Sequence, residues 1–307
     1  MLWPLCKPAI ACYGPQKRDG TMIVTRLFGG LGNQLFQFAI GKSLATRLGV
    51  ELRLDNRYFD IPRPDELCIH HFGHNTADVD RTTMPATRQE GLLPYIAGKI
   101  RGMPYQVFQE RGLAYDLAFE GLGDETYLKG YWQSERYFRG HADIVRRSLN
   151  VVTPPTKANA KLLAELETCV PVSLHVRRGD YVSNAKFHAT HGTCDLDYYR
   201  RATDQMAQKL NKDLVFYAFS DEPDWVRENL KLPHEMRIVS HNGPDHNYED
   251  IRLMRHCAHH IIANSSFSWW GAWLNPNPDK IVMTPSRWFA DPKMQKHDLL
   301  PPEWIRL

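Results

Sequence analysis

Two arginines, a glycine and an aspartate directly follow an apolar run in VSLHVRRGDYV, residues 172–182. The apolar run is typical of a buried strand, and ligands of open α/β sheets bind beyond the carboxyl ends of the strands. A guanidinium keeps its charge at any ordinary pH, and its planar fork matches two phosphate oxygens. The stretch therefore predicts an anion site at the end of a strand.

Strand alternation separates the two arginines. Successive side chains point to opposite faces, so His175 and Arg177 share one face and Arg178 takes the other. We expect Arg177 to reach into the site and Arg178 to pair with an acid elsewhere. The alternative for each arginine is an ion pair that serves the structure alone.

A second stretch with anion-binding character is ANSSFSWWGAW, residues 263–273. A strand ends at Asn264 and a helix begins near Ser266 or Phe267, and the N–H groups and dipole of a helix start favour an anion. Ser265 and Ser266 add hydroxyl donors. Ordinary N-capping by serine is the alternative.

The glycine-rich stretch FGGLGNQ, residues 28–34, resembles a dinucleotide-binding turn but lacks its third glycine, whose position holds Leu35. Gly41, Lys42 and Ser43 lie within a helical pattern, without the preceding glycine of a phosphate loop. NAD and ATP sites are therefore poorly supported. A close approach of this backbone to some ligand stays open.

Acid-x-acid and histidine-rich stretches are the candidates for a metal. DVD (78–80) and DLD (195–197) have the form found in metal-dependent sugar-nucleotide enzymes, but such triplets are frequent by chance, and Asp195 occupies a helix N-cap position. CIHHFGH (68–74) and HCAHH (256–260) lack paired zinc spacing. The sequence predicts no metal site.

Strands and helices alternate around these stretches. MIVTRL, the helical pattern QLFQFAIGKSLATRLG and VELRLD form a strand–helix–strand opening from Met22, with Gly49 placed to cap the helix. Residues 60–125 are irregular, and the aromatic stretch 127–138 is expected to line a cleft. Beyond residue 170, strands alternate with helices to the end, which predicts a parallel, doubly wound sheet.

A pair of prolines, Pro154 and Pro155, lies between the two α/β runs, and 307 residues suit two domains. We predict an N-terminal domain at 22–154 and a C-terminal domain at 155–307, facing each other across a cleft. Residues 1–21 lack the basic start and continuous apolar block of a signal peptide. They are expected to be a disordered extension, with Met22 as an alternative start.

Composition narrows the class of protein. A hydrophobic content of 43% and a charged content of 24% are typical of globular chains, and a net charge of +3 without a long basic run gives a nucleic-acid partner little support. No apolar run reaches the ~20 residues of a membrane span. Six scattered cysteines indicate reduced thiols. We therefore expect a cytoplasmic protein, at most peripherally associated with the membrane.

Four stretches, GGLGNQLFQFA, HVRRGDY, SDEPDW and NSSFSWWGAWL, resemble in order those of the bacterial α-1,2-fucosyltransferases of glycosyltransferase family 11. The resemblance covers most of 22–282. It implies a GT-B-like fold of two Rossmann-like domains, with the acceptor on the first and GDP-β-L-fucose on the second. It also implies inverting, metal-independent transfer of L-fucose, without a cofactor, to the 2-hydroxyl of a terminal β-galactoside in surface polysaccharide or O-antigen.

The resemblance also implies roles for single residues. Related fucosyltransferases hold GDP with a His-x-Arg pair, here His175 and Arg177, and with a Ser-Phe step at a helix start, here Ser266 and Phe267. An acid that touches the nucleoside matches Asp250. The complete predicted donor-binding set is Gly29, Gly32, Asn33, His175, Arg177, Arg178, Ser220, Asp221, Asp250, Asn264, Ser265, Ser266 and Phe267.

The general base is not carried over, because the position of the glutamate base of the core α-1,6 relatives holds Ala185. Asp180 is the first candidate and His191 the second, with plain loop structure an equal alternative for His191. Arg177 completes the predicted catalytic set. The open alternatives are another fucosyl linkage such as α-1,6, a metal-dependent glycosyltransferase, and a noncatalytic protein that binds nucleotide or glycan.

Overall fold

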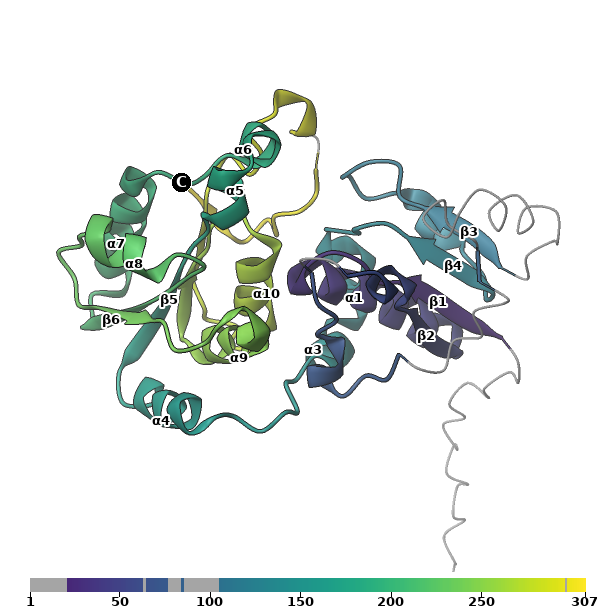
Figure 1. The fold of residues 1–307 in the computed structure, drawn as a ribbon, viewed down its shortest axis with the longest axis horizontal. Coiled ribbons are helices and arrows are strands. Elements are labelled where there is room, and N and C mark those ends of the chain that lie inside the picture. The colour runs from purple at the N-terminus through teal and green to yellow at the C-terminus, as the bar shows by residue number, and fades with distance from the viewer. Residues whose placement is uncertain (1–20, 63–64, 77–83, 86–104, 296) are drawn as a thin grey trace, which may run out of the picture.

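The computed structural model describes residues 21–62, 65–76, 84–85, 105–295 and 297–307. Within them the chain forms two parallel α/β units that face each other (Figure 1). This arrangement confirms the predicted fold class, GT-B-like with two Rossmann-like parts. The DVD stretch and nearly all of the predicted extension lie outside the described residues. No described helix combines the length and the apolar character needed to cross a membrane.

The first unit is built on a four-stranded sheet of order β2-β1-β4-β3, with every pair parallel. Its strands are β1 (Met22–Arg26), β2 (Glu51–Asp55), β3 (Gln106–Gln109) and β4 (Thr126–Lys129). Helix α1 (Leu31–Leu48) connects β1 to β2 and ends at Gly49, whose φ of 69° is left-handed. The predicted strand–helix–strand opening and its glycine cap are confirmed.

The second unit is built on a six-stranded parallel sheet of order β10-β9-β8-β5-β6-β7. Its strands are β5 (Val170–Val176), β6 (Leu214–Ser220), β7 (Met236–Val239), β8 (His259–Ile261), β9 (Val282–Thr284) and β10 (Ile305–Arg306). The chain adds β6 and β7 on one side of β5 and then returns to add β8 on the other. The crevice between the carboxyl ends of β5 and β8 is therefore the switch point where such sheets bind ligands.

Helices connect the strands of the second unit. They are α4 (Lys157–Leu166), α5 (Gly179–Ser183), α6 (Ala185–His191), α7 (Leu196–Leu210), α8 (Pro223–Asn229), α9 (Asn247–His256) and α10 (Ser266–Leu274). The predicted helix α7 is confirmed, and its cap Asp195 accepts a hydrogen bond from the Tyr198 amide at 2.6 Å. Helices α5 and α6 were not predicted. Asn184 separates them by capping α6 through the amides of Lys186 and Phe187.

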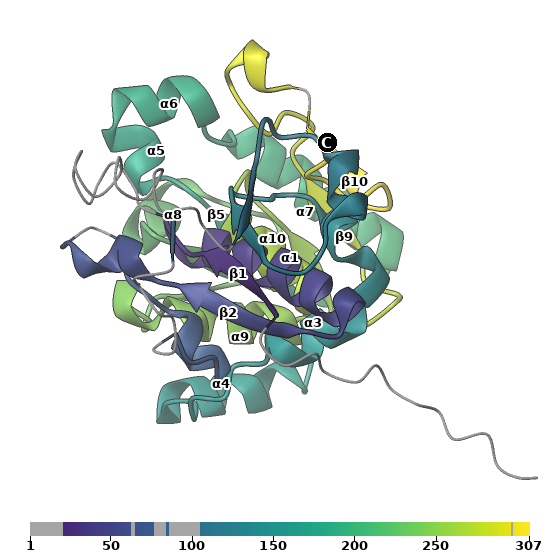
Figure 2. The same cartoon turned by 90° about the vertical axis from the view of Figure 1, so that its right-hand side faces the viewer.

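The two units share one aromatic core where α1 packs against α10 (Figures 1 and 2). The ring of Phe36 on α1 lies 4.5 Å from that of Trp269 and 4.8 Å from that of Trp270 on α10. Trp270 donates its indole N–H to the carbonyl of Gly32 at 2.9 Å. The units are thus joined by buried side chains as well as by residues 150–156, which form no helix or strand.

The aromatic stretch 127–138 contributes to that core rather than to a cleft wall. Trp132, Tyr137 and Phe138 are buried, and Phe138 stacks on Trp270 at 5.6 Å. The prediction that this stretch lines a cleft was therefore wrong for most of its aromatic residues. The spacing of its aromatic residues indicated a face that is covered. The sequence alone could not distinguish a face covered by α10 from a face covered by a ligand. Helix α3 (Ala142–Ser148) follows this stretch and packs on α1.

Candidate functional site

The two predicted anion-binding stretches flank the switch point of the second sheet. Arg177 comes directly after β5, and α10 begins five residues after β8 ends. The strands β5 and β8 are hydrogen-bonded neighbours, so their carboxyl ends open into the same crevice. From the other unit, the start of α1 reaches this place, because Gly32 lies against the first residues of α10.

Arg177 is held between two carboxylates. Its guanidinium lies 2.5 Å from an oxygen of Asp180 and 3.0 Å from one of Asp221, and its carbon lies 5.2 Å from the centre of the Tyr181 ring. Burial opposes the charge, but Asp221 and Asp180 outweigh it and raise the pKa of Arg177. One fixed positive charge, that of Arg177, is therefore held between two carboxylates.

Asp221 is the more buried partner, with 26% of its side chain exposed against 42% for Asp180. Its second oxygen accepts the backbone N–H of Arg178 at 2.9 Å. Gly179 has a φ of 25°, and a Cβ built on it would lie 2.5 Å from Asp221 Oδ2. A glycine is needed there because Asp221 passes so close to the backbone.

Arg178 is turned away from Arg177, toward α8. It forms an ion pair with Glu222 at 3.0 Å, and its guanidinium lies 3.7 Å from the centre of the Trp225 ring. The hydroxyl of Ser220 accepts the Glu222 amide at 3.0 Å and so stabilises the same turn. The expectation that one arginine pairs with an acid elsewhere describes Arg178. Donor binding by Arg178 and Ser220 stays a prediction.

His175 is a buried histidine on the strand that leads to Arg177. The residue is only 4% exposed, and its ring lies 5.7 Å from that of Phe267. Its Nδ1 has no hydrogen-bond partner among the described residues. Burial, aided by the nearby Arg177, lowers the pKa of His175 to about 3. The ring is therefore neutral and can act as a hydrogen-bond donor without adding charge.

The start of α10 combines a satisfied cap with open donors. Ser265 is the N-cap, and its hydroxyl accepts the Phe267 amide at 3.3 Å, which is the ordinary capping that the sequence left as an alternative. The amide and hydroxyl of Ser266 have no partner among the described residues. A Cβ built on Gly32 would lie 2.7 Å from the Phe267 nitrogen and from Ser266 Oγ, so only a glycine allows this approach.

The glycine turn of the first unit is fixed by side-chain amides. Gly29 has a φ of 74°, and its carbonyl accepts a hydrogen bond from Gln34 at 2.9 Å. Asn33 accepts one from Gln133 at 2.8 Å. Of the three predicted residues Gly29, Gly32 and Asn33, Gly32 lies against the start of α10, and donor binding by all three stays a prediction.

Two predicted donor-binding residues have other partners. Asn264 is buried, and its amide donates to the carbonyls of His191 and Trp288 at 2.9 and 3.1 Å, which ties the end of α6 to the strand end. Asp250 lies in the first turn of α9 and accepts a hydrogen bond from Asn242 at 2.8 Å. Burial raises the pKa of Asp250 to about 7. Contact of either residue with a donor stays a prediction.

His191, the second candidate base, stacks on Tyr181 with ring centres 4.6 Å apart and planes 9° apart. Burial lowers its pKa, more than Asp180 raises it. Both His191 and Arg177 therefore contact the Tyr181 ring. Neither Tyr181 nor Gln133 was predicted from the sequence. Tyr181 lies in α5, a helix that was not predicted, and its contact with Arg177 depends on the turn that leads into that helix.

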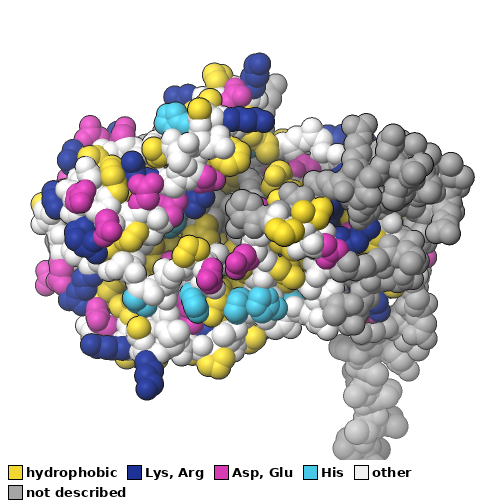
Figure 3. All heavy atoms as spheres, in the orientation of Figure 1, with side chains coloured by type: hydrophobic (Ala, Val, Ile, Leu, Met, Phe, Trp, Pro, Cys, Tyr) yellow, Lys and Arg dark blue, Asp and Glu magenta, His cyan; other side chains and the backbone are white. Residues whose placement is uncertain are grey.

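The histidine-rich stretches have structural roles. His71 stacks on Tyr248 at 3.6 Å, and histidine side chains gather on one part of the surface drawn in Figure 3. His260 lies between Ser173 and Asn275, with its ring nitrogens at 2.8 and 2.9 Å from their polar atoms. Within the described ranges, no group of three or more His, Cys, Asp or Glu side chains is arranged to hold a metal.

Comparison with known proteins identifies the family. Residues 103–307 match glycosyl transferase family 11. The chain is 31% identical to an Alpha-1,2-colitosyltransferase of Escherichia coli, over 94% of this chain and 99% of that protein. It is 29% identical to the Escherichia coli O-antigen biosynthesis glycosyltransferase WbnK, over 92% and 99% of the two chains. The crystal structure of fucosyltransferase NodZ from Bradyrhizobium matches with 15% identity and a TM-score of 0.46, over 83% and 93%. The chain is a glycosyltransferase that belongs to glycosyl transferase family 11.

Proposed function

We propose that this glycosyltransferase transfers L-fucose from GDP-β-L-fucose to the 2-hydroxyl of a terminal β-galactoside, with inversion and without a metal. The observation that carries the proposal is Arg177, held by two carboxylates directly after β5, on the strand whose His175 contacts Phe267 of α10. The α-1,2 linkage in the name of one relative and the O-antigen in the name of the other support the linkage and the kind of acceptor.

The chemistry follows from where charge develops. The acceptor hydroxyl attacks the anomeric carbon while GDP departs, through an oxocarbenium-like transition state. Negative charge then grows on the oxygen of the β-phosphate, where a preorganised donor is most effective. Arg177 supplies a fixed positive charge there, and Ser266 and neutral His175 supply hydrogen-bond donors. The diphosphate would replace Asp180, the more exposed of the two carboxylates on Arg177.

The test is incubation with GDP-fucose and lactose, with and without EDTA, followed by assay of GDP and linkage analysis of the trisaccharide. We expect an α-1,2-linked product and an unchanged rate in EDTA. GDP binding without turnover would favour the noncatalytic alternative. A rate abolished by EDTA would favour a metal-dependent enzyme. A trisaccharide with another linkage would contradict the proposed α-1,2 linkage.

Colitose is a second candidate for the transferred sugar, because it is L-fucose without the 3-hydroxyl and one relative is named for it. Side-by-side measurement of kcat/KM with GDP-fucose and GDP-colitose separates the two. A preference of tenfold or more for GDP-colitose would assign the enzyme to colitosyl transfer.

The ionisation of Asp250 should make nucleotide affinity depend on pH. Only an ionised carboxylate accepts both N–H groups of the guanine edge, and with a pKa of about 7 its ionised fraction rises about tenfold between pH 6 and 8. We expect the dissociation constant of GDP, measured by calorimetry, to fall by about tenfold over that range. Asp250→Asn should bind GDP more weakly and lose this dependence, whereas Asp245→Asn, at an exposed carboxylate nearby, should keep it.

The stability of the free protein should change in the opposite direction. Because the folded-state pKa of Asp250 lies above its ordinary value of 3.8, the stability that its neutral form provides is complete in acid and is lost as pH rises through about 7. The free energy of unfolding of the wild type should therefore fall relative to Asp250→Asn between pH 6 and 8. If the difference in free energy of unfolding between the wild type and Asp250→Asn stayed constant from pH 6 to 8, the raised pKa of Asp250 would be contradicted.

A further inference from the structure

The carboxylates around Arg177 are poorly suited to accept a proton. Asp180 and Asp221 both form ion pairs with the guanidinium, so either carboxylate would have to give up that ion pair to accept a proton. Both also lie on the side of the crevice where the diphosphate is proposed to bind. An attacking hydroxyl needs a carboxylate on the opposite side, where the acceptor enters.

Asp65 is a carboxylate on that opposite side. A Cβ built on Gly30 would lie 3.6 Å from Asp65 Oδ1, so the carboxylate lies beside the glycine turn of the first unit. Two residues further along this turn, Gly32 contacts Ser266 at the start of α10. Asp65 and Ser266 therefore both lie against the start of α1, at positions two residues apart, which puts Asp65 within reach of a sugar on the proposed diphosphate.

The partners of Asp65 leave it available as a base. The Tyr58 hydroxyl donates to Asp65 Oδ2 at 3.3 Å, and among the described residues Asp65 has no ion pair. Gly30 is the N-cap of α1 and has no side chain to satisfy the first amides of the helix. The Asp65 carboxylate therefore lies beside a helix start that receives no side-chain cap from Gly30.

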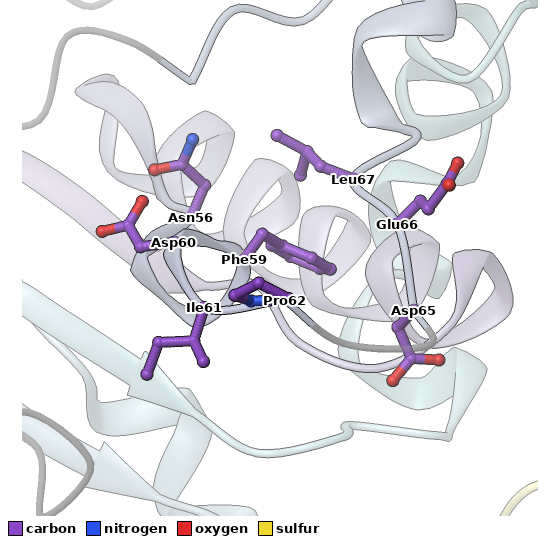
Figure 4. A pocket seen from close by; sticks show the side chains of 8 residues that line it. All are labelled: Asn56, Phe59, Asp60, Ile61, Pro62, Asp65, Glu66 and Leu67. Carbon is purple, nitrogen blue, oxygen red and sulfur yellow. The ribbon is translucent and has the colours of Figure 1, made fainter.

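A cavity of about 400 Å³ opens next to Asp65, within the size range of small-molecule sites. Asn56, Asp60 and Glu66 line it together with the apolar side chains of Phe59 and Leu67. Figure 4 shows the Asp65 carboxylate at the edge of this cavity, pointing away from its middle. Carboxylates and an amide suit the hydroxyls of a sugar, and an aromatic ring suits its C–H face. Asp65 would lie between an acceptor bound in this cavity and the glycine turn at Gly30.

We propose that Asp65 is the general base of the transfer, an inference that rests on the proposed function. Asp65 takes the proton of the acceptor hydroxyl, whose oxygen forms the bond to the anomeric carbon. The bond from that carbon to the β-phosphate oxygen breaks, and GDP leaves with the electron pair. The proton on Asp65 then passes to solvent. Tyr58 positions the carboxylate through its hydrogen bond.

The test is Asp65→Asn, which keeps the size of the side chain and removes its basicity. We expect the rate of transfer to the acceptor to fall by about 10²–10⁴-fold, with GDP affinity and thermal unfolding unchanged. The rise of kcat/KM with pH that ionisation of the base causes should disappear. Asp143→Asn, at an exposed carboxylate on α3, is the matched control and should transfer at the wild-type rate.

A second variant separates a chemical from a structural role. Asp65→Ala should be equally slow, and added formate should restore part of its transfer rate by supplying a carboxylate in the vacated space. Normal transfer by Asp65→Asn in an active wild type would overturn the role of Asp65 alone. Failure of the wild type to transfer from either GDP-sugar would overturn the proposed function and this inference with it.

Discussion

Replacing Arg177 with alanine is expected to lower the transfer rate by about 10²–10³-fold, the usual loss when one fixed donor to a developing anion is removed. Asp180 and Asp221 would lose their cation, and the departing phosphate would lose the charge that stabilises it. The measurement is GDP release in the presence of acceptor, at saturating donor. Because the effect lies in the transition state, kcat should fall more than donor affinity.

Lysine and a distant arginine provide the controls. Arg177→Lys keeps the charge but loses the planar fork, so it should recover only part of the rate. Arg200→Ala removes an arginine that is paired with Asp197 on the exposed face of α7, and it should leave the rate unchanged. An Arg177→Ala enzyme that is folded and turns over at nearly the wild-type rate would exclude the assignment of the fixed cation.

Gly32→Ala is expected to have the second large effect, on stability and activity together. The new methyl group would lie 2.7 Å from the backbone nitrogen of Phe267, and backbone cannot rotate out of the way. Overpacking of this kind costs about 1–3 kcal/mol. The methyl group would also push the start of α1 away from the start of α10, where the donor is proposed to bind. We expect a lower unfolding midpoint in urea and a transfer rate reduced by at least tenfold.

Gly140→Ala is the matched control, because a Cβ built there meets no atom within 4 Å. It should leave both the unfolding midpoint and the transfer rate close to those of the wild type. If Gly32→Ala were as stable and as active as Gly140→Ala, the close contact between the two helix starts would not exist in solution.

Local pattern was enough to predict most of the second unit. β-Branched and apolar runs marked β5 and β6, and helical spacing with a capping aspartate marked α7. The order of these elements, together with the rule that ligands bind beyond the carboxyl ends of parallel strands, was enough to expect Arg177 and Ser266 near one crevice. Periodicity and capping act within a few residues, so a single sequence contains them.

Contacts between distant parts of the chain could not be predicted from local sequence patterns. Gln133 meets Asn33 across 100 positions, and Trp270 meets Gly32 across 238. Asp65 follows an irregular stretch with no periodic signal, so its closeness to Gly30 depends on how η1 (Arg57–Asp60) turns the chain after β2. Helix α5 is only five residues long, which is too short for a repeating apolar pattern to identify it.

The tryptophan-rich contact between α1 and α10 bears on how substrates come and go. Separating the two units at the contact between α1 and α10 would expose Trp269 or Trp270 to water. Losing the packing of one such side chain costs about 3–5 kcal/mol. A state that costly is populated less than about once in a hundred molecules. If GDP binds as proposed, its exchange is therefore expected to occur without separation of α1 from α10, through side-chain movements such as the displacement of Asp180 from Arg177.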